Sequence, residues 1–271
     1  MYGFPIIAPE GHVFQVFFYF WRCISVLKEN LTFVVTCVVV IAALFLVAKL
    51  CEKYVCRDFR RITGSRKIAY IAMFSALGGV LMLLEIPLFF APGFYKMDLS
   101  ELPVLMSAFY LGPVAGVTTE LLKVIIKLLL KGTTTAFVGD FANFVVGCAF
   151  ILPASIIYHH HKTRKTAIIG MVVGTLCLTV FGSAFNAFYL IPKFSVLFGL
   201  PLEQIVAMGT AVNSSITSVG TLVLFAVVPF NILKGVIDSL LTYLLYKRVE
   251  HLLFRETRQQ KTPPAPQESK P

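Results

Sequence analysis

Charged residues are scarce in this chain of 271 residues. They make up 14% of the composition, whereas hydrophobic residues make up 57% and the mean hydropathy is +0.81. A typical soluble domain contains about 25% charged residues. The shortage of charge excludes an ordinary soluble fold and predicts an integral membrane protein.

Motifs that would give the chain catalytic chemistry are also missing. The sequence contains no phosphate-binding loop of the form GxxxxGK[ST], so it has no ATPase site of its own with which to power transport. It contains no HExxH motif, no aspartate-rich motif and no evident nucleophile–base pair, which disfavours a membrane enzyme. We therefore expect no catalytic residues and no cofactor.

Two clusters of metal-binding residue types occur in the sequence. Cys51 and Cys56 have a possible zinc spacing but lack a second pair, and the histidines at 159–161 are followed by basic residues. Incidental thiols and a solvated helix end explain both, so we expect no metal site.

Long stretches without a charged residue indicate helices that cross a membrane. Residues 31–48, 141–158 and 166–192 form uncharged runs of 18, 18 and 27 residues. Each reaches the length of ~18 residues that indicates a transmembrane helix. We predict an all-α, polytopic membrane protein in which one extra N-terminal transmembrane helix precedes a six-helix bundle.

The formal net charge of +10 is distributed unevenly along the chain. Seven Lys or Arg residues lie at 49–67, three at 162–165 and six from 247 to the end, and the intervening loops carry few. This alternation follows the positive-inside rule, which predicts a cytoplasmic C-terminus and an external N-terminus in the cell membrane. Because no nucleic-acid-binding motif accompanies the basic residues, we expect the lipid bilayer, not nucleic acid, to be their partner.

Composition divides the chain into successive parts. These are an aromatic-rich interfacial segment (1–30), the extra transmembrane helix (31–50), a basic cytoplasmic linker (51–64), the six-helix domain (65–248) and a cytoplasmic tail that is partly disordered (249–271). Within the domain, the predicted helix at 101–111 is too short to cross the ~30 Å hydrocarbon core. Short helices at membrane depth tend to line a cavity. Residues 192–218 are predicted to form a long external loop.

Polar residues interrupt the last apolar stretch. Residues 204–233 carry no charge, and Lys234 follows while apolar residues continue beyond it. A charge at this depth costs about 2.5–3.5 kcal/mol on insertion scales, so it faces a cavity, a partner or a ligand. Asn231, Lys234 and Asp238 fall at i, i+3 and i+7, on one helical face. They indicate either a ligand site or a Lys234–Asp238 ion pair that joins two helices.

Further polar residues gather toward the external half of the predicted bundle. They are Asp98, Ser100 and Glu101 around the short helix, Asp140 and Asn143 at the start of another helix, and Asn186 in a third. Each residue alone could cap a helix or link two helices, but their convergence favours a pocket. Glu120, Lys123 and Lys127 share one helical face, and we interpret them as a self-paired polar stripe.

These features together resemble the substrate-binding S component of energy-coupling factor (ECF) vitamin transporters, in its riboflavin-binding branch. The resemblance covers about residues 65–248. The residues that carry it are 97–103 (MDLSELP), 111–116 (LGPVAG), 131–135 (KGTTT), Asn143 and 229–235 (PFNILKG).

The resemblance implies a role for particular residues. It makes Asn186, Asn231 and Lys234 hydrogen-bonding partners of riboflavin, and it places Asp98, Leu99 and Ser100 in a loop that closes over the ligand. Asn143 belongs to the same predicted substrate site. Ala72 and Ala76 match an alanine motif that contacts a membrane coupling subunit, and their spacing lets a partner helix approach closely.

The implied function is ATP-driven riboflavin uptake. The chain would capture riboflavin at the external face and work with a separate transmembrane coupling subunit and two cytoplasmic ATPases. Another vitamin, or a membrane-embedded binding or sensor protein without transport, remains as an alternative. The extra N-terminal helix has no counterpart in the family pattern.

Overall fold

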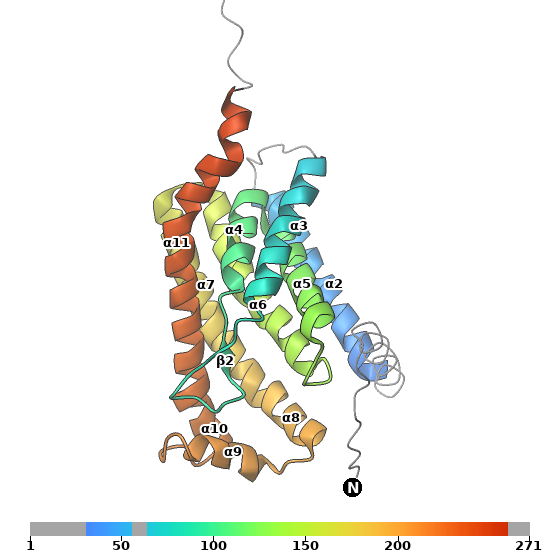
Figure 1. The fold of residues 1–271 in the computed structure, drawn as a ribbon, viewed down its shortest axis with the longest axis vertical. Helices are drawn as coiled ribbons and strands as arrows, with labels where there is room; N and C mark the ends of the chain where they lie inside the picture. The colour runs from blue at the N-terminus through green and yellow to red at the C-terminus, as the bar shows by residue number, and fades with distance from the viewer. Residues whose placement is uncertain (1–30, 56–63, 260–271) are drawn as a thin grey trace, which may run out of the picture.

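The computed structural model describes residues 31–55 and 64–259, which are mostly helical (Figure 1). The predicted interfacial segment, most of the basic linker and the end of the tail lie outside these residues. The α-helices are α2 (Leu31–Tyr54), α3 (Gly64–Leu81), α4 (Glu101–Leu111), α5 (Pro113–Lys131), α6 (Val138–His160), α7 (Arg164–Phe185), α8 (Ile191–Phe198), α9 (Leu202–Thr210), α10 (Val219–Leu222) and α11 (Val228–Gln259). Two π-helical turns, η1 (Asn186–Leu190) and η2 (Val223–Val227), continue α7 and α10.

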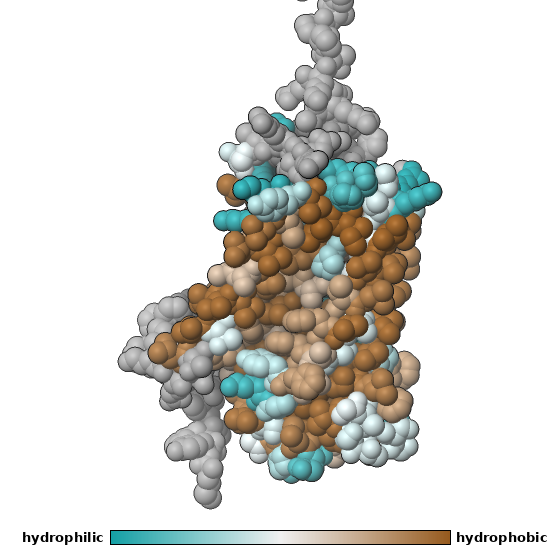
Figure 2. Space-filling model, turned by 180° about the vertical axis from the view of Figure 1, so that it is seen from behind, coloured by the Kyte–Doolittle hydropathy of each residue, from teal (hydrophilic) through white to brown (hydrophobic). Residues whose placement is uncertain are grey.

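The helices present an apolar surface suited to lipid. Four helical segments of the described chain are long and apolar enough to cross a membrane: Phe33–Tyr54, Val138–His160, Arg164–Phe198 and Val219–Tyr246. Figure 2 shows hydrophobic residues over much of one face, with hydrophilic residues at its upper end and others in its lower part. The all-α membrane class is confirmed, whereas the predicted number of spanning helices stays a prediction.

The sequence-based boundaries differ from the structure in two places. Helix α2 continues past residue 50 to Tyr54, into the predicted linker. The stretch 192–218, predicted to be a loop, contains most of α8 and all of α9. In α8 the apolar residues Ile191, Phe194 and Phe198 recur at helical spacing, which favours a helix. Gly199, with φ of 62°, then ends α8 in the left-handed region that favours glycine.

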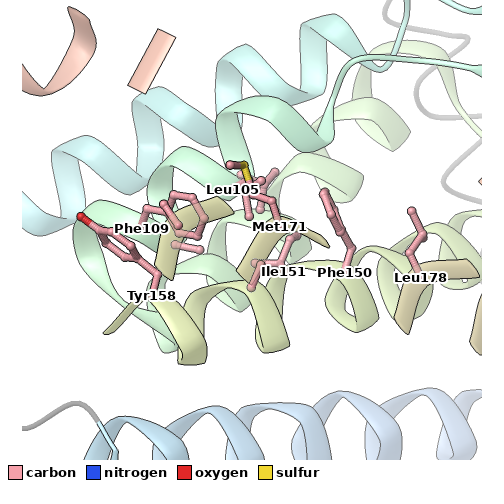
Figure 3. Packing of buried hydrophobic residues seen from close by; sticks show 11 residues of the cluster. Leu105, Phe109, Phe150, Ile151, Tyr158, Met171 and Leu178 are labelled. Carbon is pink, nitrogen blue, oxygen red and sulfur yellow. The ribbon is translucent and has the colours of Figure 1, made fainter. Parts of the chain in front are cut away.

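The bundle core lies between α4, α6 and α7. Its buried members include Leu105 and Phe109 from α4, Phe150 and Ile151 from α6, and Met171 from α7 (Figure 3). Helix α4 has only 11 residues and is buried along nearly all of its length. At about 1.5 Å per residue it is too short to span the membrane alone. Helix α4 therefore begins inside the bundle, where its first residues can face an internal cavity.

Helix α7 packs directly on the backbone of α6 through two glycines. A Cβ atom at Gly170 would lie 2.6 Å from the carbonyl oxygen of Ala154, and one at Gly174 would lie 2.7 Å from that of Phe150. The two glycines are four residues apart, the spacing at which small residues permit close contact between membrane helices. This contact fixes the helix that carries Asn186 at its end.

We expect Gly170→Ala to lower the free energy of unfolding by about 1–3 kcal/mol, because the added methyl group must push two helix backbones apart. Thermal unfolding in detergent measures the effect as a lower Tm. Gly64→Ala is the matched control, since a Cβ there meets no atom within 4 Å. Equal Tm values for the two variants would contradict the close α6–α7 contact.

The extra helix α2 packs against α5 and α6. Its Ala48 is buried beside Phe144 and Cys148 of α6. Near its end, a carboxylate oxygen of Glu52 accepts a hydrogen bond from the backbone N–H of Val114 at 3.3 Å. Helix α2 thus attaches to the side of the bundle. Helix α3 makes its main contacts with α4 and α5 instead.

Candidate ligand-binding site

A cavity of about 720 Å³ opens among the helices at the end of the molecule that holds α8 and α9. Its walls come from the loop 82–100, the turn between α5 and α6, the first half of α6, the end of α7 with η1, the helices α8 and α9, and the start of α11. In Figure 1 these elements lie in the lower part of the bundle, opposite the C-terminal end of α11. Distant parts of the sequence therefore meet around one space.

Most of the residues that the sequence predicts for the substrate site line this cavity. Asp98 comes from the loop before α4, Asn143 from α6, Asn186 from η1, and Asn231 and Lys234 from α11. The structure places these five side chains around a single volume. Their assignment to a particular ligand remains a prediction.

Leu99 and Ser100 are not among the lining residues. Ser100 is fully buried, and its backbone N–H donates a hydrogen bond of 2.9 Å to Oδ1 of Asp98. The Ser100 hydroxyl donates to the same oxygen. In the structure, Ser100 therefore orients Asp98 at the start of α4, and Leu99 is half-buried beside it.

The two asparagines are held by different neighbours. The hydroxyl of Tyr95 donates to Oδ1 of Asn186 at 2.8 Å, and Nδ2 of Asn186 donates to the carbonyl oxygen of Gly182 at 2.8 Å. Nδ2 of Asn231 lies at the hydrogen-bond limit of 3.5 Å from the Ser183 hydroxyl. Each amide keeps hydrogen-bonding capacity that a ligand can use.

Lys234 pairs with residues at the start of α4. Its Nζ lies 3.4 Å from Oδ2 of Asp98 and 3.7 Å from Oε1 of Glu101. No ion pair joins Lys234 to Asp238 in the part of the chain that the structure describes. The ion-pair partners of Lys234 are therefore Asp98 and Glu101, and not Asp238 as the alternative interpretation proposes.

A second ion pair network lies next to Lys234 inside the bundle. Nζ of Lys123 lies 2.9 Å from Oε1 of Glu101 and 2.7 Å from Oε1 of Glu120. The sequence predicts ion pairing within the polar stripe of α5, and Glu120 and Lys123 do form such a pair. Glu101 of α4 joins the same network through Lys123. Helix α6 comes so close here that a Cβ at Gly147 would lie 2.3 Å from Glu120.

The loop over the cavity is tied to the end of α5. Oε1 of Glu85 lies 2.5 Å from Nζ of Lys131, and its Oε2 lies 2.6 Å from Nζ of Lys96. Burial opposes ionisation of Glu85, but the two lysines outweigh that effect and hold the pKa of this carboxyl below its ordinary value. Between these anchors, β1 (Ile86–Pro87) pairs with β2 (Lys96–Met97) in antiparallel register.

Aromatic and aliphatic side chains form most of the remaining wall. They include Phe94 and Tyr95 from the loop, Phe194 and Phe198 from α8, Ile205 and Met208 from α9, and Phe230 from α11. The sequence offers four aromatic residues as candidates for such a wall: Phe90, Phe94, Tyr95 and Tyr189. Phe94 and Tyr95 line the cavity, whereas Phe90 and Tyr189 are not among the lining residues. The α8 and α9 residues are not predicted as site residues, because the segment is expected to be a loop. The helical spacing of their apolar residues is the feature of the sequence that could have predicted these two helices.

This combination of groups suits a flat heteroaromatic ligand. Aromatic side chains can pack against the faces of a ring, asparagine can donate to and accept from its edge, and lysine can donate to a carbonyl oxygen. Within residues 31–55 and 64–259 there is no group of three or more His, Cys, Asp or Glu side chains that could hold a metal ion.

Comparison with known proteins identifies similar chains. Residues 66–246 match the family described as "ECF transporter, substrate-specific component". The chain is 31% identical over 191 residues to a riboflavin transporter RibU of Staphylococcus aureus (strain TCH60), covering 70% of this chain and 94% of that protein. It is 32% identical to a riboflavin transporter RibU of Streptococcus thermophilus (strain ATCC BAA-250 / LMG 18311), covering 72% and 87%.

The fold is also similar to a solved structure, that of the S component of a bacterial ECF transporter. The TM-score is 0.55 at 31% sequence identity, and the match covers 70% of this chain and 98% of the other. All three alignments leave the remaining residues of this chain, about 30%, without a counterpart.

Proposed function

The chain belongs to the substrate-specific components of ECF transporters, and we propose that its substrate is riboflavin. The observation that carries this proposal is the meeting of Asn186, Asn231 and Lys234 in one cavity with aromatic walls. Relatives that this chain matches over about 70% of its length are riboflavin transporters.

The chemistry of riboflavin matches these groups. The ring system has a uracil-like edge with alternating donors and acceptors, which the amides of Asn186 and Asn231 can complement. The Lys234 ammonium has only donors and suits a ring carbonyl oxygen. Asp98 orients Lys234. Leu99 and Ser100 support the loop over the ligand, and Asn143 contributes a further polar contact.

Energy for uptake comes from other subunits, because the sequence has no ATPase motif. The partners are a transmembrane coupling subunit and two cytoplasmic ATPases. Ala72 and Ala76 are exposed on α3, next to the exposed apolar residues Met73, Leu77 and Val80. We assign this face of α3 to the coupling subunit, since the alanines allow another helix to approach closely.

The orientation in the membrane follows from the basic residues. Arg164 begins α7 and Arg66 lies in the first turn of α3, and both ends lie on the side of the molecule opposite the cavity. Positive residues favour the cytoplasmic side. The cavity then faces the exterior, α2 begins outside, and α11 ends in the cytoplasm. Residues 65–248 form the binding domain, with α2 as an added anchor and with neither an enzymatic activity nor a cofactor of its own.

Release of the bound molecule tests the substrate. We expect the protein purified in detergent to be yellow and to release near-stoichiometric riboflavin on denaturation, identified by mass spectrometry. Recovery of thiamine, biotin or another vitamin at that yield would contradict the proposal and identify that vitamin as the substrate.

A further inference from the structure

Lys123 of α5 is a buried charge that lies behind the cavity and not in its wall. Its side chain is 0% exposed, and neither Lys123 nor its partner Glu120 is among the lining residues, whereas Glu101 and Lys234 are. A buried ion pair is weak evidence for stability, because the cost of removing both charges from water can exceed their attraction. Lys123 therefore needs an explanation other than stability.

The two lysines of the network differ in how tightly their ammonium groups are held. Nζ of Lys123 donates a hydrogen bond of 2.9 Å to Oε1 of Glu101 and lies 2.7 Å from Oε1 of Glu120. Nζ of Lys234 lies farther from its partners, at 3.4 Å from Oδ2 of Asp98 and 3.7 Å from Oε1 of Glu101. Charge-assisted N–H···O bonds are typically about 2.7–2.9 Å long. Lys234 is therefore held loosely, and its donors remain available to a ligand.

A single carboxylate oxygen connects the two lysines. Oε1 of Glu101 lies within 4 Å of both ammonium groups, and the shorter distance is the one to Lys123. Within residues 31–55 and 64–259, these two lysines are the only cations that form ion pairs with Glu101. If Lys123 lost its charge, Lys234 would be the remaining cation for Glu101. Because attraction between charges is strong in a low-dielectric interior, Glu101 would then compete with the ligand for Lys234.

Glycines on two neighbouring helices fix the position of the network. On α3, a Cβ at Gly78 would lie 3.2 Å from Cγ of Lys123, so the lysine stem packs against the helix backbone. On α6, a Cβ at Gly147 would lie 2.3 Å from Oε1 of Glu120 and 3.1 Å from Oε1 of Glu101. The close approach of both backbones restricts Lys123 to its place beside the two carboxylates before any ligand binds.

We propose that Lys123 is a positioning residue for riboflavin binding, because it occupies Glu101 and thereby keeps the Lys234 ammonium available to the ligand. This inference rests on the proposed function, since Lys123 acts only through the lysine that meets riboflavin. Lys123 makes no contact of its own with the ligand. Its loss is therefore expected to weaken riboflavin binding only while Lys234 is present.

A double-mutant cycle tests this dependence. Lys123→Met alone leaves the Glu120 carboxylate without its cation and can fail to fold, so a paired variant adds Glu120→Gln and keeps the balance of charge. Fluorescence titration with riboflavin gives the Kd of each variant. The paired variant is expected to raise the Kd about tenfold, because Lys234 then pairs with Glu101. In the Lys234→Met background, the same pair of substitutions is expected to change the Kd less than twofold.

A rescue and a control distinguish positioning from general destabilisation. Adding Glu101→Gln to the paired variant is expected to restore most of the lost affinity, because glutamine has no charge with which to hold Lys234. Thr119→Val is the matched control, since it removes the buried contact of 2.7 Å between the hydroxyls of Thr119 on α5 and Ser107 on α4, away from the cavity wall. The control is expected to lower the Tm without changing the Kd.

The outcomes separate this inference from the proposed function. If the wild type binds no riboflavin, the proposed function fails and the inference falls with it. If the wild type binds riboflavin and the paired variant weakens binding equally with and without Lys234, Lys123 acts on the fold alone and the inference is overturned. Unchanged affinity of the paired variant, or no recovery on adding Glu101→Gln, overturns it as well.

Discussion

Lys234→Met is expected to weaken riboflavin binding roughly tenfold to a hundredfold, because a charge-assisted hydrogen bond contributes about 1.5–3 kcal/mol. Methionine retains most of the volume of the lysine stem but cannot donate to a ring carbonyl. The measurement is a fluorescence titration of the purified variant. Lys49→Met, an exposed position on α2, serves as the matched control with unchanged affinity.

The same change is expected to lower stability, because Asp98 and Glu101 lose a buried cation. Breaking a buried ion pair by removing one partner costs about 3–5 kcal/mol. The affinity measurement distinguishes the two roles of Lys234. A variant with a lower Tm but wild-type affinity would show that Lys234 only holds α11 against α4. Asp238→Asn should leave affinity intact, since Lys234 makes no ion pair with Asp238 within the described residues.

The second large effect is expected at the exposed face of α3. The double variant Ala72→Leu and Ala76→Leu should abolish riboflavin uptake in cells while the purified protein still binds riboflavin. Both alanines face away from the bundle, so leucine does not disturb its core. It does fill the space that a closely packed partner helix needs.

Copurification of the coupling subunit and the ATPases gives the second readout, and both should be recovered in smaller amounts. Ala42→Leu with Ala43→Leu is the matched control, because these alanines are exposed on α2 instead of α3. Normal uptake by a well-expressed α3 variant would show that its alanine face contacts lipid only.

Several features of the site could be predicted from single residues. Lys234 could be identified because a lysine within an apolar helix is costly and needs a partner. Asn231 could be identified because it shares a helical face with Lys234 in the motif at 229–235. The role of Asn186 comes from the family resemblance. The lining residues of α8 and α9 could not be identified, because the sequence predicts a long loop at 192–218, whereas apolar residues at helical spacing form two short helices there.

Pairing among the charged residues could not be derived from spacing. Helical spacing offers Asp238 as the neighbour of Lys234, yet the structure places Asp98 of the loop before α4 and Glu101 of α4 within 4 Å of its ammonium group. Likewise, Lys127 shares a face with Lys123 but pairs with Asp140 of α6. A side chain of this length can reach several elements, and only their packing decides which one lies within 4 Å.

The sequence by itself determined that the chain is an all-α membrane protein, because the scarcity of charge and the long apolar runs depend only on composition and order along the chain. It also determined the residue types available for a ligand. Only the tertiary structure decided that residues from separate segments of the chain surround one cavity, and that Lys234 lies beside Asp98 and Glu101. Those properties arise from contacts between helices, such as Gly170 against Ala154, that no local pattern specifies.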